Sequence, residues 1–187
     1  MCEPLAVAMH GVNRAEVKPG DKVVVFGCGP IGLGMLLWLI DRGVTDVVAL
    51  DLSEERLERA RALGVRAALN PAEVDLRAEL ARLHGEVPSY GRVGVGTDAY
   101  IDAAGAPNIL TQVIMMAKFH ARLVITAAYM KPLEFPVPHA DQRDDHHHRR
   151  RLPHRNARGD RGHAAPQGQD RRDDQPQAAV PRRHEGP

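Results

Sequence analysis

Residues 22–51 read KVVVFGCGPIGLGMLLWLIDRGVTDVVALD, and this stretch decides the fold of the chain. The apolar run 23–26 leads directly into a turn that contains three glycines. A long apolar segment, 31–40, follows, and a second apolar run, 47–50, ends on Asp51. This order predicts a strand, a glycine turn, a helix, a second strand and a carboxylate at the end of that strand.

The turn has the spacing GxGxxG, and each of its glycines has a steric role. Gly27 lets the chain leave the strand sharply, Gly29 lets backbone approach a ligand, and Gly32 lets the helix pack close to the strand. Pro30 suits the first turn of a helix, where its missing N–H costs no hydrogen bond. Because the N–H groups and the dipole at the start of a helix hold phosphate groups, the turn is predicted to bind a pyrophosphate.

The acid that ends the second strand completes the pattern. Asp51 lies 19 residues after Gly32, the spacing at which an acid meets the ribose hydroxyls of an adenosine. Two predicted strands and a terminal acid frame the glycine turn, so the stretch predicts a dinucleotide site. The alternative is a glycine-rich turn that binds no ligand.

The first 138 residues alternate predicted helices and strands, which indicates an α/β fold with a parallel, doubly wound sheet of five strands. Helices are expected at residues 4–15, 30–42, 53–63, 71–83 and 108–118. Strands are expected at 23–26, 47–50, 67–69, 99–104 and 122–127, with a loop at 91–96. The second helix is apolar nearly all round and is predicted to be buried on both sides. The fifth strand should pair with the fourth and have a free outer edge.

Composition divides the chain into two parts. The net charge of the 187 residues is +1, but residues 139–187 contain no aromatic residue and only two large aliphatic residues, Leu152 and Val180. Such a segment buries too little apolar surface to offset the entropy of ordering it. We therefore expect a folded domain at residues 1–138 and a disordered tail at residues 139–187.

The remaining composition favours a cytoplasmic protein. The longest apolar stretch, 31–40, is too short to span a membrane, and no signal peptide is visible. Cys2 and Cys28 do not have the spacing of a metal site or a disulfide, and Cys28 is expected to serve packing inside the glycine turn.

Five segments carry a resemblance to a known family: EPLAV at residues 3–7, KPGDKVVVFGCGPIG at 18–32, DLSEERLERARALGV at 51–65, YIDAAGAP at 100–107 and ARLVITAAY at 121–129. In this order, they make residues 3–138 resemble the coenzyme-binding half of zinc-type, medium-chain alcohol and polyol dehydrogenases, most of all the sorbitol and threonine dehydrogenase branch. The resemblance implies a Rossmann-type domain, NAD as cofactor and hydride transfer between an alcohol CH–OH group and NAD.

The resemblance also implies which residues contact the cofactor. The pyrophosphate of NAD would lie against the glycine turn, at Gly27, Gly29, Pro30 and Gly32. The nicotinamide side would be lined by Ile31, Ala104 and the backbone of Thr126. Asp51 would bind the adenosine ribose and favour NAD, because the 2′-phosphate of NADP would lie against its carboxylate. Arg56 matches a basic residue near that ribose and would soften the preference; the alternative is a solvated helix residue.

Glu3 is the metal candidate of the chain. In the polyol branch, the Glu of this EP motif lies at or beside the catalytic zinc; the alternative here is an ordinary residue of an N-terminal helix. A catalytic zinc needs about three protein ligands. The family's other ligands precede the EP motif, so we expect an N-terminally truncated chain without catalytic residues of its own, and His10 is a poor substitute ligand.

The tail departs from the family after FPVP at residues 135–138. There the family continues into a sixth strand, whereas this chain becomes rich in Arg and His. A shift of one base in the coding DNA permits a Thr- and Ile-rich strand followed by a turn, starting from Asp144. We therefore interpret the segment after about residue 138 as out of frame, with the sixth strand lost; the alternative is a genuine disordered tail.

Three functions remain open at this stage: the NAD-binding part of an alcohol or polyol dehydrogenase, inactive as a fragment; a non-catalytic dinucleotide-binding module; and nucleic-acid or metal binding through the tail. The third is disfavoured because acids are interleaved with the arginines and no aromatic residue is present to stack on bases. We expect a small alcohol or polyol as substrate of the intact enzyme, no nucleic acid, no membrane, and the homo-oligomer typical of the family.

Overall fold

A computed structural model of the chain describes residues 2–89 and 91–130. The expected tail at 139–187 and the change of frame after residue 138 lie outside the described residues and remain predictions. No helix in this part of the chain is long and apolar enough to cross a membrane.

Five parallel strands form one sheet in the order β3-β2-β1-β6-β7, which confirms the predicted parallel, doubly wound sheet. They are β1 (Lys22–Phe26), β2 (Asp46–Leu50), β3 (Ala67–Leu69), β6 (Ala99–Asp102) and β7 (Arg122–Ile125). From β1 the chain first adds strands on one side and then crosses to the other. In such sheets the ligand crevice opens at the carboxyl ends of the strands on either side of this crossing.

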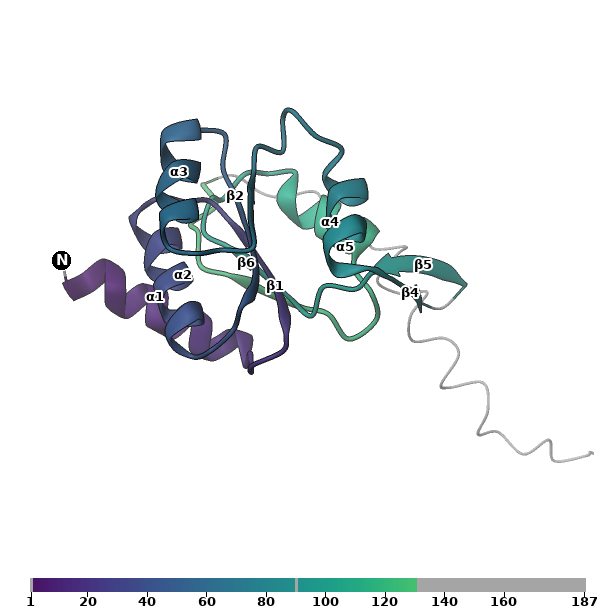
Figure 1. Cartoon of the computed structure of the whole chain (residues 1–187), viewed down its shortest axis with the longest axis horizontal. Coiled ribbons are helices and arrows are strands. Elements are labelled where there is room, and N and C mark those ends of the chain that lie inside the picture. Colours follow the sequence, from purple (N-terminus) through teal and green to yellow (C-terminus); the bar gives the residue numbers. More distant parts are fainter. Residues whose placement is uncertain (1, 90, 131–187) are drawn as a thin grey trace, which may run out of the picture. The chain divides into compact units, whose positions relative to one another are not determined.

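Helices cover both faces of the sheet (Figure 1). One face carries α1 (Cys2–Ala15), α2 (Pro30–Asp41) and α3 (Glu54–Ala62), and the other carries α4 (Leu76–His84) and α5 (Ile109–Met116). Alternate residues of β1 enter the two cores: Val23 and Val25 pack on the side of α1 to α3, and Val24 and Phe26 on the side of α4 and α5.

Helix α2 packs on the sheet beside α1, and it is not buried all round. A Cβ on Gly34 would lie 3.0 Å from the Cβ of Ala8, so a glycine allows the two helices to approach closely. Trp38 Nε1 donates a hydrogen bond to the carbonyl oxygen of Leu5 over 3.3 Å. Leu37, however, is 48% exposed, so the prediction that both sides are buried is wrong on that side. Helix α1 covers only part of the outer surface of α2.

Two further elements differ from the sequence-based expectation. Helix α4 begins at Leu76 and not at Pro71, because Asp75 caps it: Asp75 Oδ1 accepts the N–H of Ala78 over 3.1 Å. The predicted loop is part of an antiparallel hairpin of β4 (Glu86–Ser89) and β5 (Arg92–Val95). Both strands are short, and each contains a residue that is unfavourable in strands, Pro88 or Gly94.

Charged side chains join the amino ends of β1 and β6. The backbone N–H of Lys22 donates to Asp98 Oδ2 over 2.8 Å, and Lys118 Nζ donates to the other carboxylate oxygen. Lys118 Nζ also donates to the carbonyl oxygen of Gly96 over 2.9 Å. Burial opposes the charge on Asp98, but the hydrogen bonds from Lys118 and Lys22 outweigh it and lower the pKa of this carboxyl. The charged form of Asp98 therefore holds the two strands and the segment after α5 together.

A buried histidine lies at the same end of the sheet. His84 Nδ1 lies 2.7 Å from Thr97 Oγ1, and Nε2 lies 3.3 Å from Asp46 Oδ1 without making a hydrogen bond among the described residues. Lys22 Nζ donates to the carbonyl oxygen of His84 over 2.6 Å, and Arg66 Nη1 holds both oxygens of Asp46 at 2.7 Å. Burial lowers the pKa of His84 although Asp46 acts in the opposite direction, so the ring is neutral near pH 7.

Candidate functional site

A cleft of about 810 Å³ opens at the carboxyl ends of the strands. Its volume is in the range of small-molecule sites, about 300–1,000 Å³. Turns after four strands, β1, β2, β3 and β6, line most of it. The lining residues are Phe26, Gly27, Gly29, Leu50, Asp51, Leu52, Ser53, Glu55, Arg56, Pro71, Ala72, Ala103, Ala104, Ala106, Asn108, Ile109 and Gln112. The cleft therefore contains five of the residues that the sequence predicts to contact a cofactor: Gly27, Gly29, Asp51, Arg56 and Ala104.

The glycine turn has a geometry that only glycine permits at two positions. Gly27 has φ +93°, and a Cβ there would lie 3.1 Å from the backbone N of Ala104. A Cβ on Gly32 would lie 1.8 Å from the carbonyl oxygen of Gly27, so α2 packs directly on the turn. The Cβ position of Gly29, in contrast, has no atom within 4 Å. A ligand can therefore approach the backbone at Gly29.

The start of α2 presents backbone donors beside the cleft. Pro30 is the first helical residue, and the N–H of Leu33 donates to the carbonyl oxygen of Gly29 over 2.8 Å. The N–H groups of Ile31 and Gly32 precede this first intrahelical bond and have no partner within the helix. Together with the positive end of the helix dipole they form a site for an anion. The side chains of Pro30 and Ile31 do not line the cleft itself.

Asp51 is fixed by backbone N–H groups on both carboxylate oxygens. Oδ2 accepts the N–H of Cys28 over 2.7 Å, and Oδ1 accepts the N–H of Ser53 over 2.9 Å. The side chain is 8% exposed and lines the cleft. A carboxylate has about four lone-pair positions, so these two bonds leave room for two hydroxyl donors. The geometry fits two neighbouring ribose hydroxyls.

Arg56 is the cation nearest to this carboxylate among the ion pairs of the described residues. Its Nη1 lies 3.6 Å from Asp51 Oδ2, and its side chain is 52% exposed. At this distance and exposure the two charges attract each other only weakly. Arg56 lines the cleft and can turn toward an added anionic group without breaking a strong contact.

Cys28 lies under the turn and not in the cleft. Its side chain is fully buried, with Sγ 3.8 Å from the carbonyl oxygen of Leu50. Burial, and next the charge of Asp51, raise the pKa of this thiol to about 12. A neutral thiol is a poor nucleophile and metal ligand, so the geometry agrees with the packing role expected for Cys28.

The predicted nicotinamide side is only partly in the cleft. Ala104 lines it, whereas Thr126 does not. The N–H and Oγ1 of Thr126 donate to the carbonyl oxygen of Asp102 over 2.9 and 2.8 Å, so this threonine joins β7 to β6. The roles of Ile31 and Thr126 remain predictions.

Sequence reasoning missed two groups of lining residues. Pro71 and Ala72 follow β3, and Asn108, Ile109 and Gln112 lie at the start of α5. A signal was present for the second group, because the sequence Gly-Ala-Pro-Asn follows a buried strand at its carboxyl end. The first group lacks such a signal, since its position depends on where β3 lies in the sheet.

The metal candidate, Glu3, lies exposed in the first turn of α1. Among residues 2–89 and 91–130, no group of three or more His, Cys, Asp or Glu side chains could hold a metal ion. The described residues therefore do not fit a zinc site, and we derive no step through zinc from them.

Comparison with known proteins places the chain in a family. The family described as zinc-binding dehydrogenase matches residues 30–148. The (R,R)-butanediol dehydrogenase of Bacillus subtilis is 36% identical over 135 residues, which are 72% of this chain and 36% of that protein. A probable D-xylulose reductase A of Aspergillus terreus is 41% identical over 112 residues, 59% of this chain and 31% of that protein.

Solved structures show the same relation. A protein of E. coli CFT073 described as a short chain alcohol dehydrogenase, complexed with NADH, superposes with a TM-score of 0.64 at 27% identity, over 75% of this chain and 39% of that one. The chain thus spans about a third of the length of the curated relatives that it matches. The family match starts at Pro30, at the beginning of α2, and includes β2, β3, β6 and β7. The chain belongs to the zinc-binding dehydrogenase family and carries its coenzyme-binding domain.

Proposed function

We propose that this chain is the NAD-binding part of a zinc-type alcohol or polyol dehydrogenase. One observation carries the proposal: the carboxylate of Asp51 is held in the cleft by two backbone N–H groups, one of which belongs to the glycine turn. The adenosine ribose and the pyrophosphate would thus meet parts of one connected structure. The relative of E. coli CFT073 that binds NADH supports the choice of cofactor.

The residues of the chain would act on the cofactor in three ways. Gly29 admits the pyrophosphate to the backbone, and the N–H groups of Ile31 and Gly32 donate to it. Asp51 accepts the ribose hydroxyls and disfavours a 2′-phosphate by repulsion. Ala104 forms part of the wall beyond the glycine turn. When bound, NAD supplies the hydride acceptor for an alcohol.

The complete reaction is proposed for the whole enzyme and not for this chain alone. Its relatives are about three times as long as the matched region, and two of them are named for butanediol and xylulose. We therefore propose an alcohol or polyol as the substrate class, a zinc ion held by residues outside the described part, a cytoplasmic location and a homo-oligomer as assembly. With zinc and NAD added, the chain alone is expected to oxidise no alcohol measurably.

A comparison of cofactor affinities tests the proposal. Isothermal calorimetry with NADH and NADPH should show tighter binding of NADH by the 187-residue chain. Asp51→Ala should reduce the difference between the affinities for NADH and NADPH, because the 2′-phosphate of NADPH no longer meets a carboxylate. Asp41→Ala, which removes an exposed acid at the other end of α2, is the matched control and should leave the ratio unchanged. Preference of the wild-type chain for NADPH would contradict the assignment of Asp51.

A further inference from the structure

A second carboxylate at the carboxyl ends of the strands is buried more deeply than Asp51. Asp102 is the last residue of β6 and is fully buried. Its Oδ1 accepts the N–H groups of Ala104 and Gly105, both over 2.9 Å, and the hydroxyl of Tyr129 donates to Oδ2. A buried charge persists only where hydrogen bonds replace water. The three donors explain how a carboxylate is kept at this place.

Asp102 also joins the ends of two strands through its backbone. Its carbonyl oxygen accepts the N–H groups of Thr126 and Ala127 over 2.9 and 3.1 Å, and the hydroxyl of Thr126 over 2.8 Å. One residue therefore fixes its own turn, the end of β7 and the side chain of Tyr129.

The turn that Asp102 holds forms one wall of the cleft. Ala103 and Ala104 line the cleft, and Ala104 packs directly against Gly27, where an added Cβ would lie 3.1 Å from the backbone N of Ala104. Gly105, the last residue that the carboxylate holds, has φ +71°. The conformation of this wall thus depends on the carboxylate of Asp102.

The order of the strands assigns this wall to one half of a dinucleotide. Strands β2 and β6 are the two neighbours of β1, so Asp51 and Asp102 flank the glycine turn on opposite sides. Dinucleotides lie across the point where the strand order reverses, with the pyrophosphate over the turn. If Asp51 meets the adenosine ribose, the other half of the cofactor meets the wall held by Asp102.

We propose that Asp102 is a positioning residue for the nicotinamide half of the cofactor, and that Tyr129 secures it. The proposal rests on the proposed function, because it assumes that the cleft binds NAD. Asp102 does not touch the cofactor itself. It fixes the backbone at Ala104 through Oδ1 and ties the chain after β7 to the same wall through Oδ2. Burial, and next the hydrogen bond to Asp102, raise the pKa of Tyr129, so the hydroxyl stays a donor at physiological pH.

Two ligands that differ only in the nicotinamide separate this role from general stability. Calorimetry on the full chain should be done with NADH and with ADP-ribose. Tyr129→Phe should weaken NADH binding by roughly five- to tenfold, the effect of one hydrogen bond, and leave ADP-ribose binding within about twofold. Asp102→Asn should weaken NADH binding further, because an amide cannot accept from the turn and from Tyr129 at once. Tyr100→Phe, a buried tyrosine of β6 outside the cleft, should change neither affinity.

The outcomes are distinct. If wild-type chain binds neither NADH nor ADP-ribose, the proposed function fails. If wild type binds both, and Tyr129→Phe weakens both equally or neither, the role of Asp102 is refuted while NAD binding stands. Because Asp102→Asn can unfold the sheet, Tyr129→Phe is the deciding variant. Its melting temperature should stay within about 5 °C of wild type, since Tyr129 is only half-buried.

Discussion

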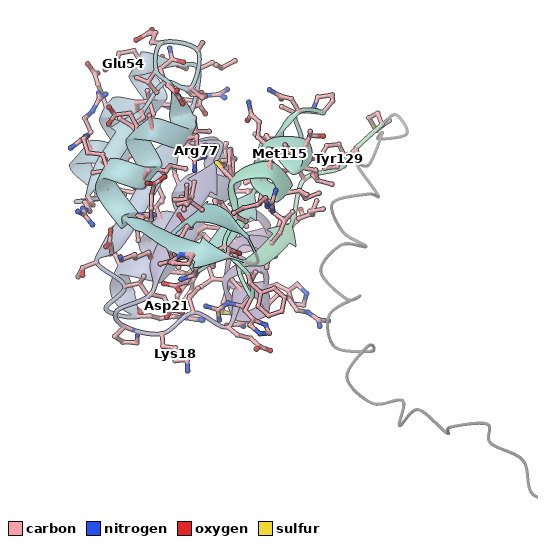
Figure 2. The ribbon with its side chains drawn as sticks, turned by 90° about the vertical axis from the view of Figure 1, so that its right-hand side faces the viewer. Lys18, Asp21, Glu54, Arg77, Met115 and Tyr129 are labelled. Carbon is pink, nitrogen blue, oxygen red and sulfur yellow. The ribbon has the colours of Figure 1, made fainter. Side chains whose placement is uncertain are left out.

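The two ends of the sheet use polar groups in opposite ways. In Figure 2 the amino ends of the strands lie toward the bottom, where Lys18 and Asp21 precede β1, and the carboxyl ends lie toward the top, where Glu54 follows β2. At the bottom, charged side chains pair with each other: Asp98 with Lys118, and Arg122 with Asp21 over 2.7 Å. At the top, carboxylates are held largely by backbone N–H groups of glycine-rich turns.

The difference teaches which polar residues shape a ligand site and which hold the sheet together. In a pair of oppositely charged side chains, each charge is satisfied by its partner and none is left to bind a ligand. The loss of such a pair should therefore lower the stability of the fold and leave cofactor binding unchanged. A carboxylate held by a turn keeps unused acceptor positions and fixes the shape of that turn. Its loss should therefore affect binding. The predictions below test this division, and the first is expected to have the largest effect.

Two glycines of one turn should respond in opposite ways. Gly32→Ala places a Cβ 1.8 Å from a backbone oxygen and should destabilise the fold by about 3 kcal/mol or more. Gly29→Ala meets no atom within 4 Å and should change stability by less than about 1 kcal/mol. Its methyl group should nevertheless weaken NADH binding, because it occupies the approach to the backbone. Urea unfolding and calorimetry measure the two effects. A Gly32→Ala chain as stable as wild type would mean that α2 does not pack on the turn as described.

A substitution at the amino ends of the strands should change the stability of the fold and not the affinity for the cofactor. Asp98→Asn removes the charge that accepts bonds from Lys118 and Lys22, and it should lower the free energy of unfolding by about 1.5–3 kcal/mol. NADH affinity should stay within about twofold of wild type. A loss of affinity without a loss of stability would break the comparison, because the amino end would then act on the cleft.

Low pH should destabilise the fold through His84, which lies at the amino ends of the strands. The pKa of this histidine is lowered in the folded chain by burial, so below its ordinary value of about 6.5 the unfolded chain binds the extra proton. Stability should therefore fall as the pH drops below about 6.5, by at most about 1.4 kcal/mol per pH unit from this residue. His84→Gln should flatten that part of the curve, and His10→Gln, exposed on α1, should not. Equal slopes for the His84 and His10 variants would contradict the neutral buried ring.

The sequence predicted the cleft end better than the amino end, for physical reasons. The glycine turn and Asp51 are local: a strand, a turn and a helix within 30 residues fix their geometry, and the pattern shows it. The alternation of helices and strands predicts the parallel, doubly wound sheet, in which the fifth strand pairs with the fourth. Helix α4 starts five residues later than the sequence predicts, because Asp75 and not Pro71 lies at its amino-terminal cap.

Long-range pairs could not be predicted in this way. His84 meets Asp46 and Thr97 only once β2, α4 and the start of β6 are assembled, and no spacing in the sequence shows it. The importance of Asp102 could have been predicted from the sequence, because this acid ends an apolar strand shortly before a glycine, much as Asp51 follows the apolar strand β2. The hydrogen bond from Tyr129, 27 residues later in the chain, could not have been predicted, because this contact depends on the pairing of β6 with β7.

The smallest effect is expected for Arg56. Its pair with Asp51 is long and half-exposed, so Arg56→Ala should change the free energy of unfolding by less than about 0.5 kcal/mol. The matched control is Arg59→Ala on the same helix. It breaks an exposed pair with Glu55, but the arginine itself does not line the cleft, and its removal should have an equally small effect on stability.

The Arg56 and Arg59 variants should differ only in how tightly they bind the cofactor. If Arg56 turns toward an added 2′-phosphate, Arg56→Ala should weaken NADPH binding about two- to threefold more than NADH binding, and Arg59→Ala should weaken neither. The difference should shrink in 0.5 M salt, because an exposed charge is screened. If Arg56→Ala instead lowered stability by more than 1 kcal/mol, the pair with Asp51 would belong with the paired charges of the amino end, and the division between the two ends of the sheet would not hold.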